Sequence, residues 1–304
     1  MNPIGRLRSL GKAGLEALIC GALAACAAGP VGSGTAPDRG RTSAPADAAT
    51  ERANGVTRTL LAKASVEDLP GFESRLYLVE FPAGVAADAR VHTEPCVGYV
   101  LEGRFESASG DEPATLKRAG EGLFVLPNRP HHVQNLEPAH PVRLLLAGAF
   151  REGEPLLRGV PEPAGFTPGT ERPRAELASA AASGSVTTVT RSLLVQREIA
   201  DLPGREARIY LIEFPPAASS KLHLHTAPGV GYVLEGSFQS AFGDQPATLT
   251  RAGEAFVDLA GKAHHFKNAD ATRPLRFVVA GIYHRDEPLF QALDAGSNGD
   301  GGTR

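Results

Sequence analysis

Residues 221–236 read KLHLHTAPGVGYVLEG, and this stretch decides the fold. Side chains two residues apart lie on the same face of a β-strand, so a strand over residues 221–225 would project His223 and His225 together. A third imidazole, His264, follows an apolar run and a Gly-containing turn. Three imidazoles that converge from separate strands form a ligand set for a divalent transition metal, which binds imidazole nitrogen at about 2.0–2.1 Å. The sequence therefore predicts a metal site on His223, His225 and His264.

The sequence around this stretch occurs twice. Residues 75–82 read RLYLVEFP and residues 208–215 read RIYLIEFP, while GYVLEG occurs at residues 98–103 and again at 231–236. The offset is 231 − 98 = 133 residues, and it holds from the first matching segment to the last. The chain therefore contains two copies of one unit, which we place at residues 57–157 and 190–290.

Each copy alternates short apolar runs with turns that contain Gly, Pro and Asp. This pattern is typical of an all-β sandwich or barrel. Residues 77–81 and 210–214 are apolar on both faces apart from one Glu each, which favours central strands. The prediction is an all-β protein with two tandem domains.

The histidine segments resemble the two sequence motifs of the cupin superfamily, whose domains are small antiparallel β-barrels or double-sheet jelly rolls. The residues that fit are His223, His225 and Gly236 for the first motif, and Gly253, Gly261, His264 and Asn268 for the second. By this resemblance the chain is a bicupin whose second domain holds a metal on the three histidines. The metal can be Zn, Ni, Cu, Fe or Mn, because all of these bind imidazole.

Two residues depart from the motifs. Gly229 stands where the family has a carboxylate ligand, and Leu259 where it has a Pro. Without that carboxylate, a divalent ion keeps its double charge and at least one open position, so it favours anionic ligands. No Glu, Asp or further His of the second copy falls at a position that must face the metal. The catalytic residues therefore stay unknown.

The first copy differs at the same positions. Arg90 corresponds to His223, His92 to His225, Cys96 to Gly229, and His131 to His264. Two imidazoles and a thiolate on His92, Cys96 and His131 can bind Zn or Cu. Arg90 opposes this, because its permanent charge repels a divalent ion. The alternatives are a degenerate copy kept for packing, or one that binds an anion through Arg90.

The amino-terminal residues 1–26 read as an export signal, with a basic start, a short apolar core and a small-residue end. Residues 23–26, LAAC, resemble the bacterial lipobox, which implies lipidation at Cys26. We expect a periplasm-facing anchor in the outer membrane of the cell envelope. Residues 27–56 read as a disordered linker, 158–189 as a linker between the copies, and 291–304 as a disordered tail.

Composition excludes one class of partner. The formal net charge of the 304 residues is −3, and the sequence has no basic tract, which argues against nucleic acid. Two functions remain open. One is a metal-dependent enzyme, by resemblance an oxygenase of a small organic anion. The other is a non-catalytic envelope protein that binds a small molecule or a metal. The oligomeric state is not predicted.

Overall fold

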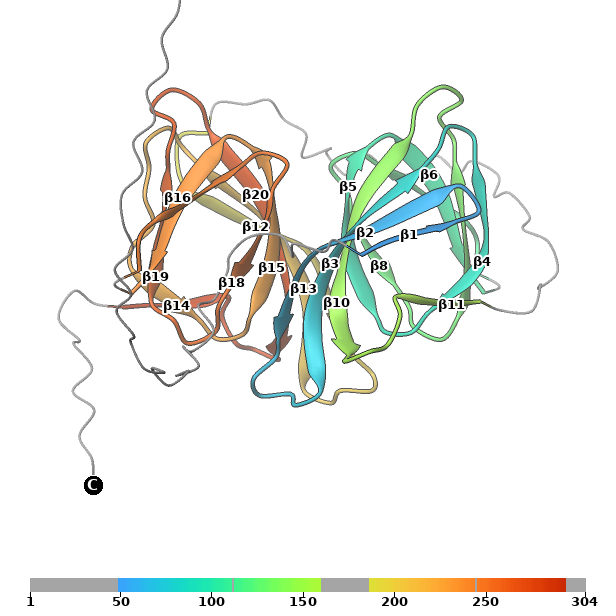
Figure 1. The fold of residues 1–304 in the computed structure, drawn as a ribbon, viewed down its shortest axis with the longest axis horizontal. Helices are drawn as coiled ribbons and strands as arrows, with labels where there is room; N and C mark the ends of the chain where they lie inside the picture. Colours follow the sequence, from blue (N-terminus) through green and yellow to red (C-terminus); the bar gives the residue numbers. More distant parts are fainter. Residues whose placement is uncertain (1–48, 111, 160–185, 244, 294–304) are drawn as a thin grey trace, which may run out of the picture. The chain divides into compact units, whose positions relative to one another are not determined.

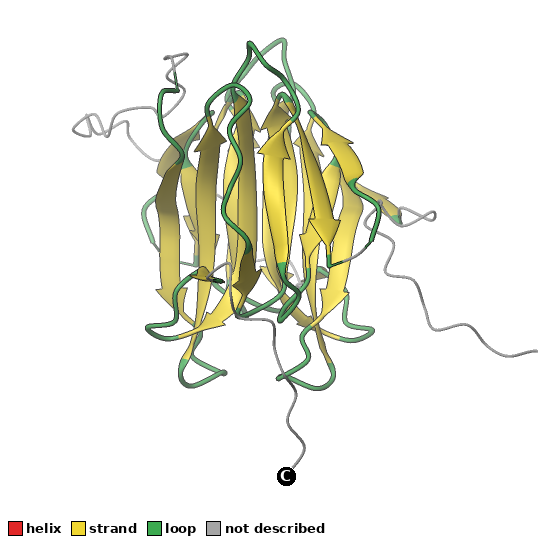
Figure 2. Ribbon diagram, turned by 90° about the vertical axis from the view of Figure 1, so that its left-hand side faces the viewer, coloured by secondary structure: helices red, strands yellow, loops and turns green. Residues whose placement is uncertain are grey.

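The computed structural model describes residues 49–110, 112–159, 186–243 and 245–293. Within these ranges the regular structure consists of β-strands, and Figure 2 shows no helix among them. The strands form four antiparallel sheets, two in each repeat. The all-β prediction is therefore confirmed.

The first domain, blue to green in Figure 1, pairs two sheets in the double-sheet manner of a jelly roll. One sheet has the order β1-β2-β3-β10-β5-β8 and the other β11-β4-β9-β6-β7. The strands are β1 (Thr50–Ala53), β2 (Val56–Ser65), β3 (Phe72–Phe81), β4 (Ala86–His92), β5 (Cys96–Glu102), β6 (Arg104–Ser109), β7 (Thr115–Arg118), β8 (Gly122–Val125), β9 (Pro130–Asn135), β10 (Val142–Arg151) and β11 (Leu157–Gly159).

The second domain, yellow to red in Figure 1, repeats this topology without a counterpart of β1. Its sheets have the orders β12-β13-β20-β15-β18 and β17-β16-β19-β14-β21. The strands are β12 (Thr190–Glu198), β13 (Arg205–Phe214), β14 (His223–His225), β15 (Gly229–Glu235), β16 (Ser237–Phe242), β17 (Thr248–Arg251), β18 (Ala255–Asp258), β19 (His264–Asn268), β20 (Leu275–His284) and β21 (Phe290–Ala292).

Apolar side chains that alternate along the strands fill the interior of each domain. The second domain buries a cluster that includes Phe238, Phe256 and Phe277 between its two sheets. The segments expected to be central lie in β3 and β13, and each of these strands has a paired neighbour on both sides. A further apolar cluster contains residues of both domains, such as Leu145 and Ile209, so the described parts of the two domains pack against each other.

The structure has strands in two segments that were predicted from the sequence to be disordered. Residues 50–53, in the predicted linker 27–56, form β1 and pair with β2 through the turn at Asn54 and Gly55. Both turn residues have positive φ, 51° and 78°, as a tight two-residue hairpin requires, and Asn-Gly is a strong signal for it. At the other end, residues 290–292 form β21 against β14, so the predicted tail 291–304 begins too early.

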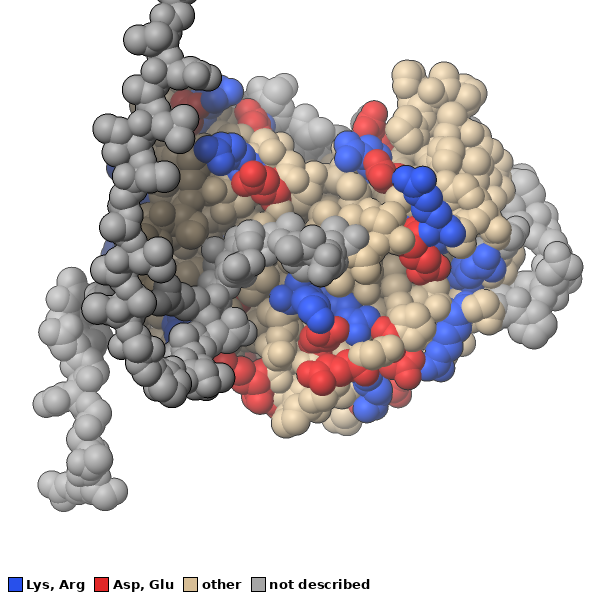
Figure 3. All heavy atoms as spheres, in the orientation of Figure 1, with Lys and Arg blue, Asp and Glu red and all other residues tan. Residues whose placement is uncertain are grey.

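Several sequence predictions fall outside the described residues. These are the export signal, the lipidation at Cys26, most of the linkers and the tail beyond residue 293. In the described part of the chain, no helix is long and apolar enough to cross a membrane. On the face shown in Figure 3, acidic and basic side chains are interspersed, in keeping with the small net charge.

Candidate metal centre

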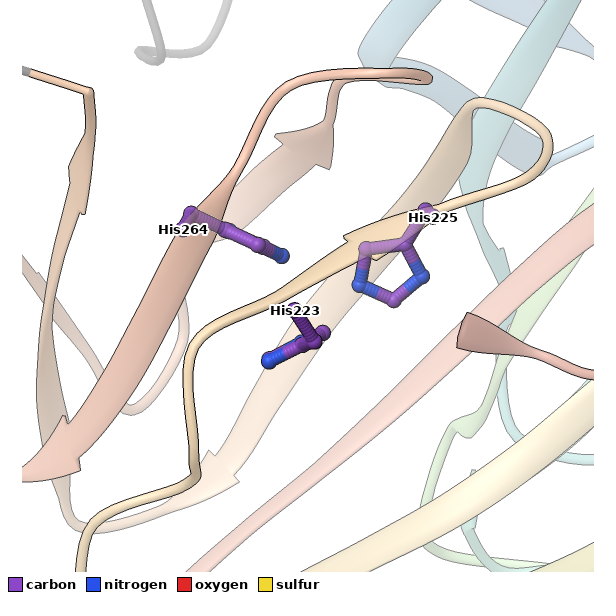
Figure 4. Close-up of side chains that lie close together, drawn as sticks. All are labelled: His223, His225 and His264. Carbon is purple, nitrogen blue, oxygen red and sulfur yellow. The ribbon is translucent and has the colours of Figure 1, made fainter. Parts of the chain in front are cut away.

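The three histidines predicted as ligands lie together inside the second domain. His223 and His225 are the ends of the short strand β14, and His264 begins β19, where it is paired with His223. Their ligand atoms all lie within 4.8 Å of one another, and all three residues are buried (Figure 4). In the described part of the chain, this is the only group of three or more His, Cys, Asp or Glu that meets this distance.

Backbone carbonyls orient two of the rings. His223 Nδ1 lies 2.8 Å from the Lys221 carbonyl oxygen, and His225 Nδ1 lies 3.0 Å from that of Leu289. A carbonyl oxygen only accepts, so each Nδ1 carries the proton and donates it. This leaves each Nε2 as a lone-pair nitrogen, the form that ligates a metal.

The remaining ring nitrogens show that the site fits a metal. His225 Nε2 and both nitrogens of His264 are buried without a hydrogen-bond partner among the described residues. Such unpartnered polar atoms are costly unless a ligand satisfies them. Burial lowers the pKa of His223 and of His225 to about 4, and that of His264 to about 2, the neighbouring imidazoles adding to the effect at His223 and His264. The rings are therefore neutral at pH 7, as metal ligation requires.

Aromatic side chains wall the centre. Phe242 stacks on His264 with ring centroids 4.6 Å apart, Phe266 meets the same ring at 4.9 Å, and Phe290 meets His223 at 5.0 Å. These contacts fix the imidazoles in place and limit the access of water. A ligand at the open metal position would lie in a largely apolar surrounding.

Asp258 is a functional candidate that the sequence did not reveal. It is 1% exposed at the end of β18, and its Oδ2 lies 3.5 Å from His225 Nε2. Both atoms have no hydrogen-bond partner among the described residues. Burial raises the pKa of Asp258 to about 8, while the pKa of His225 falls, so this contact is between neutral groups rather than an ion pair.

Tyr283 adds a second polar group nearby. Its side chain is fully buried on β20, and its hydroxyl has no hydrogen-bond partner in the described ranges. Burial raises the pKa of this hydroxyl, and the nearby Asp258 contributes to the rise. The first domain has Val125 and Phe150 at the positions of Asp258 and Tyr283. The two polar groups therefore occur only in the copy that has three histidines.

The first domain brings its predicted residues near one another without forming such a group. The His92 and His131 rings have centroids 4.7 Å apart, and Cys96 Sγ lies 3.5 Å from His92 Nδ1. Burial raises the pKa of the Cys96 thiol, so it stays protonated in the metal-free protein. The geometry therefore gives no support to a metal site on His92, Cys96 and His131.

His265, His284 and Glu235 lie outside the group of three imidazoles. His265, next to the ligand position, is exposed, and so is His284, whose Nε2 contacts Asp68. Glu235 pairs with Arg276 at 2.8 Å. Tyr99 is a core residue, and Tyr232 packs against the same cluster.

Comparison with known proteins supports this description of the fold. A family model described as Cupin domain matches residues 77–148 and again 210–281. The chain belongs to the cupin superfamily and contains two tandem cupin domains. Comparison with curated proteins finds no significant match.

The solved structures with similar folds include bicupin enzymes. A variant of Bacillus subtilis oxalate decarboxylase superimposes with a TM-score of 0.54 at 15% identity, covering 84% of this chain and 81% of the other. A formate complex of Lactobacillus farciminis oxalate decarboxylase gives 0.51 at 14% identity, covering 84% and 90%. Another B. subtilis oxalate decarboxylase structure, whose description names Mn(II) centres, gives 0.53 at 15%, covering 84% and 81%. At these low identities, the similarity to the solved structures shows a shared fold and nothing more.

Proposed function

We propose that the second domain is a metal-dependent enzyme site for a small organic anion. The observation that carries this proposal is the buried group of three neutral imidazoles, His223, His225 and His264, with ring nitrogens that lack protein partners. These three residues would hold a divalent ion, one of Zn, Ni, Cu, Fe or Mn. When bound, the ion supplies a Lewis acid with at least one open position.

The side chains around the centre define what the chain itself contributes. The carbonyls of Lys221 and Leu289 hold two imidazoles in the ligating tautomer, and the phenylalanines limit the access of water. Asp258 is the one acid in contact with the imidazole group among the described residues, so it is the candidate to hold or move a proton at Oδ2. This role was not foreseen from the sequence.

The reaction proposed from the three-histidine resemblance is oxygenation of a small carboxylate or thiol. The structural neighbours named oxalate decarboxylase suggest a second reaction on the same class of substrate, which is loss of carbon dioxide from a dicarboxylate. In both cases the substrate is an anion that binds at the open position of the metal.

A non-catalytic role is the second candidate. The one acid near the centre, Asp258, contacts His225, and no second acid or base among the described residues is grouped with the three imidazoles. A protein that only binds a metal or a small ligand would need nothing more.

One experiment separates these functions. The purified chain is loaded in turn with Fe(II), Mn(II), Ni(II), Cu(II) and Zn(II), and metal content is measured after gel filtration. Oxygen uptake is then followed with thiol acids and hydroxylated aromatic acids, and carbon dioxide release with oxalate. Turnover that is lost in His264→Ala supports the enzyme. Tight metal binding without turnover of any of these anions supports the binding protein.

We also propose that the protein is lipid-anchored in the cell envelope, facing the periplasm from the outer membrane. The support is the signal-like segment 1–26 with its LAAC end. A chain exported unfolded would take up its metal outside the cytoplasm, where strong imidazole binders such as Zn, Ni and Cu compete best.

A further inference from the structure

The first domain contains a cavity at the position that corresponds to the metal centre of the second. Its empty volume is about 510 Å³, a value that includes space open to solvent. The polar side chains that line it are Arg58, Arg90, His92, Ser107 and His131. The rest of the lining is apolar, with residues such as Phe81, Phe105 and Leu146.

Two guanidiniums, those of Arg58 and Arg90, give the wall of this cavity a positive charge. Arg58, on β2, is 6% exposed, and its Nη1 is buried without a hydrogen-bond partner among the described residues. Arg90, on β4, lines the same space, and its charge lowers the pKa of Arg58, an effect that adds to burial. None of the described residues that line the cavity is acidic.

One carboxylate acts on Arg58 from outside. Glu51 lies opposite Arg58 across the β1–β2 pair, and its charge raises the pKa of Arg58. Glu51 is exposed and does not line the cavity, and the pKa of Arg58 remains lowered. A buried guanidinium with an unpartnered nitrogen is costly, and an anion inside the cavity would satisfy it.

The imidazoles of the cavity add no charge. Burial lowers the pKa of His131 to about 4 and takes that of His92 well below its ordinary value, so both rings are neutral at pH 7. His131 Nδ1 lies 3.3 Å from the Arg90 carbonyl oxygen and donates to it. Its Nε2 then accepts a hydrogen bond, which a hydroxyl group on the body of a ligand would offer.

The two domains differ at the positions of the two cavity arginines. In the second domain the position of Arg90 is His223, and the position of Arg58 is Arg191, which is exposed and stacks over Phe290 at 4.8 Å. The first domain thus places a fixed guanidinium where the second offers a metal ligand. We propose that the first domain binds a small carboxylate without a metal, with Arg58 and Arg90 on its charged end.

The lining indicates the class of carboxylate. Two guanidiniums lie among apolar walls built from Val, Leu and Phe side chains, so the ligand needs one anionic end and a compact apolar body. A monocarboxylate with a short aliphatic chain or one aromatic ring meets both conditions. A polar dianion would leave its second charge against apolar side chains.

The test uses the full chain carrying His264→Ala, which removes the proposed metal centre and makes the result independent of it. Calorimetric titration with benzoate and hexanoate, and with benzamide as an uncharged analogue of benzoate, measures binding. We expect saturable binding of at least one carboxylate and none of benzamide. Arg58→Met and Arg90→Gln should each weaken carboxylate binding at least about tenfold, because the loss of one hydrogen bond to a charged group costs about this factor or more in affinity. Arg191→Met is the matched control, and it should bind as before.

Thermal unfolding without ligand distinguishes binding from a structural role. Because Arg58 has an unpartnered buried charge, Arg58→Met should melt at the same or a higher temperature while losing benzoate binding. A structural arginine would instead lower the melting temperature and leave binding by the folded fraction unchanged. The proposal is overturned if neither carboxylate binds, if benzamide binds as tightly as benzoate, or if both arginine variants bind like the control.

Discussion

Gly229 and Asp258 lie directly opposite each other on β15 and β18. A Cβ atom added at Gly229 would lie 3.5 Å from Asp258 Cβ and 3.7 Å from its Oδ2. The same Cβ would lie 2.9 Å from Val279 Cγ2, so the side chain of the family's carboxylate ligand has no room there, and Asp258 instead places an acid on the neighbouring strand. In the first domain the equivalent pair is Cys96 and Val125, which has no acid.

This relationship predicts that Asp258 supports the metal centre. Asp258 Oδ2 lies 3.5 Å from the ligating nitrogen of His225, so an ionised carboxylate there would offset part of the charge of a bound ion. Asp258→Asn should therefore weaken metal binding about 10- to 100-fold, the usual cost of losing a group that supports the ligands. Competition with a chromogenic chelator measures the affinity. Asp270→Asn, in an exposed loop, is the control and should bind as the unchanged chain does. Unchanged metal affinity in Asp258→Asn would show that Asp258 does not contribute to metal binding.

The three histidines should account for the bound metal. His225→Ala or His264→Ala removes one of three nitrogen ligands and should abolish most binding, so metal analysis should find about one ion per chain before the change and little after it. His92→Ala and the exposed His265→Ala should keep the metal. Two ions per chain, or equal losses from His92→Ala and His225→Ala, would show that the first domain also binds metal.

The sequence predicted the histidine group because its determinants are local. The period of two places His223 and His225 on one face, and the second family motif, which begins at Gly253, adds His264. Asp258 was missed because its role depends on the register between β15 and β18, which an apolar run ending in Asp does not reveal. Strand β1 was missed although Asn54-Gly55 is a hairpin signal, because the residues before it are polar and exposed.

The cavity of the first domain could be predicted only in part. Arg90 is visible as the replacement of a histidine in the repeat, and it indicated an anion. The sequence did not indicate that Arg58 lines the same site, because an Arg stands at the equivalent position of both copies. Only the packing shows that Arg58 is buried in a cavity while Arg191 is exposed over Phe290.

The anchor is tested at Cys26. In the proposed lipoprotein this cysteine carries the lipid and becomes the mature amino terminus, so Cys26→Ser should release the protein from the membrane fraction or leave the signal uncleaved. Fractionation and the mass of the mature protein measure both effects. Cys96→Ser, which changes a buried thiol of the first domain, is the control and should remain in the membrane fraction. Normal cleavage and unchanged attachment of Cys26→Ser would contradict the lipid anchor.

Tyr283 provides a prediction about the stability of the second domain. Its buried hydroxyl has no partner among the described residues, and an unsatisfied buried polar group costs about 1–3 kcal/mol. Tyr283→Phe, the residue of the first domain at this position, should therefore raise the free energy of unfolding of the metal-free protein by up to this amount. Urea unfolding measures the change.

Tyr210→Phe is the matched control for that change. Tyr210 lies edge-on to Tyr283, with ring centroids 6.3 Å apart, and its hydroxyl interacts with the guanidinium of the buried Arg208, whose pKa it raises. Removing this hydroxyl should destabilise the protein by about 1 kcal/mol, so the two substitutions are expected to act in opposite directions. A loss of stability in Tyr283→Phe would mean that its hydroxyl does have a partner. Asp258, whose carboxyl contributes to the raised pKa of Tyr283, would then be the group to test by combining Tyr283→Phe with Asp258→Asn.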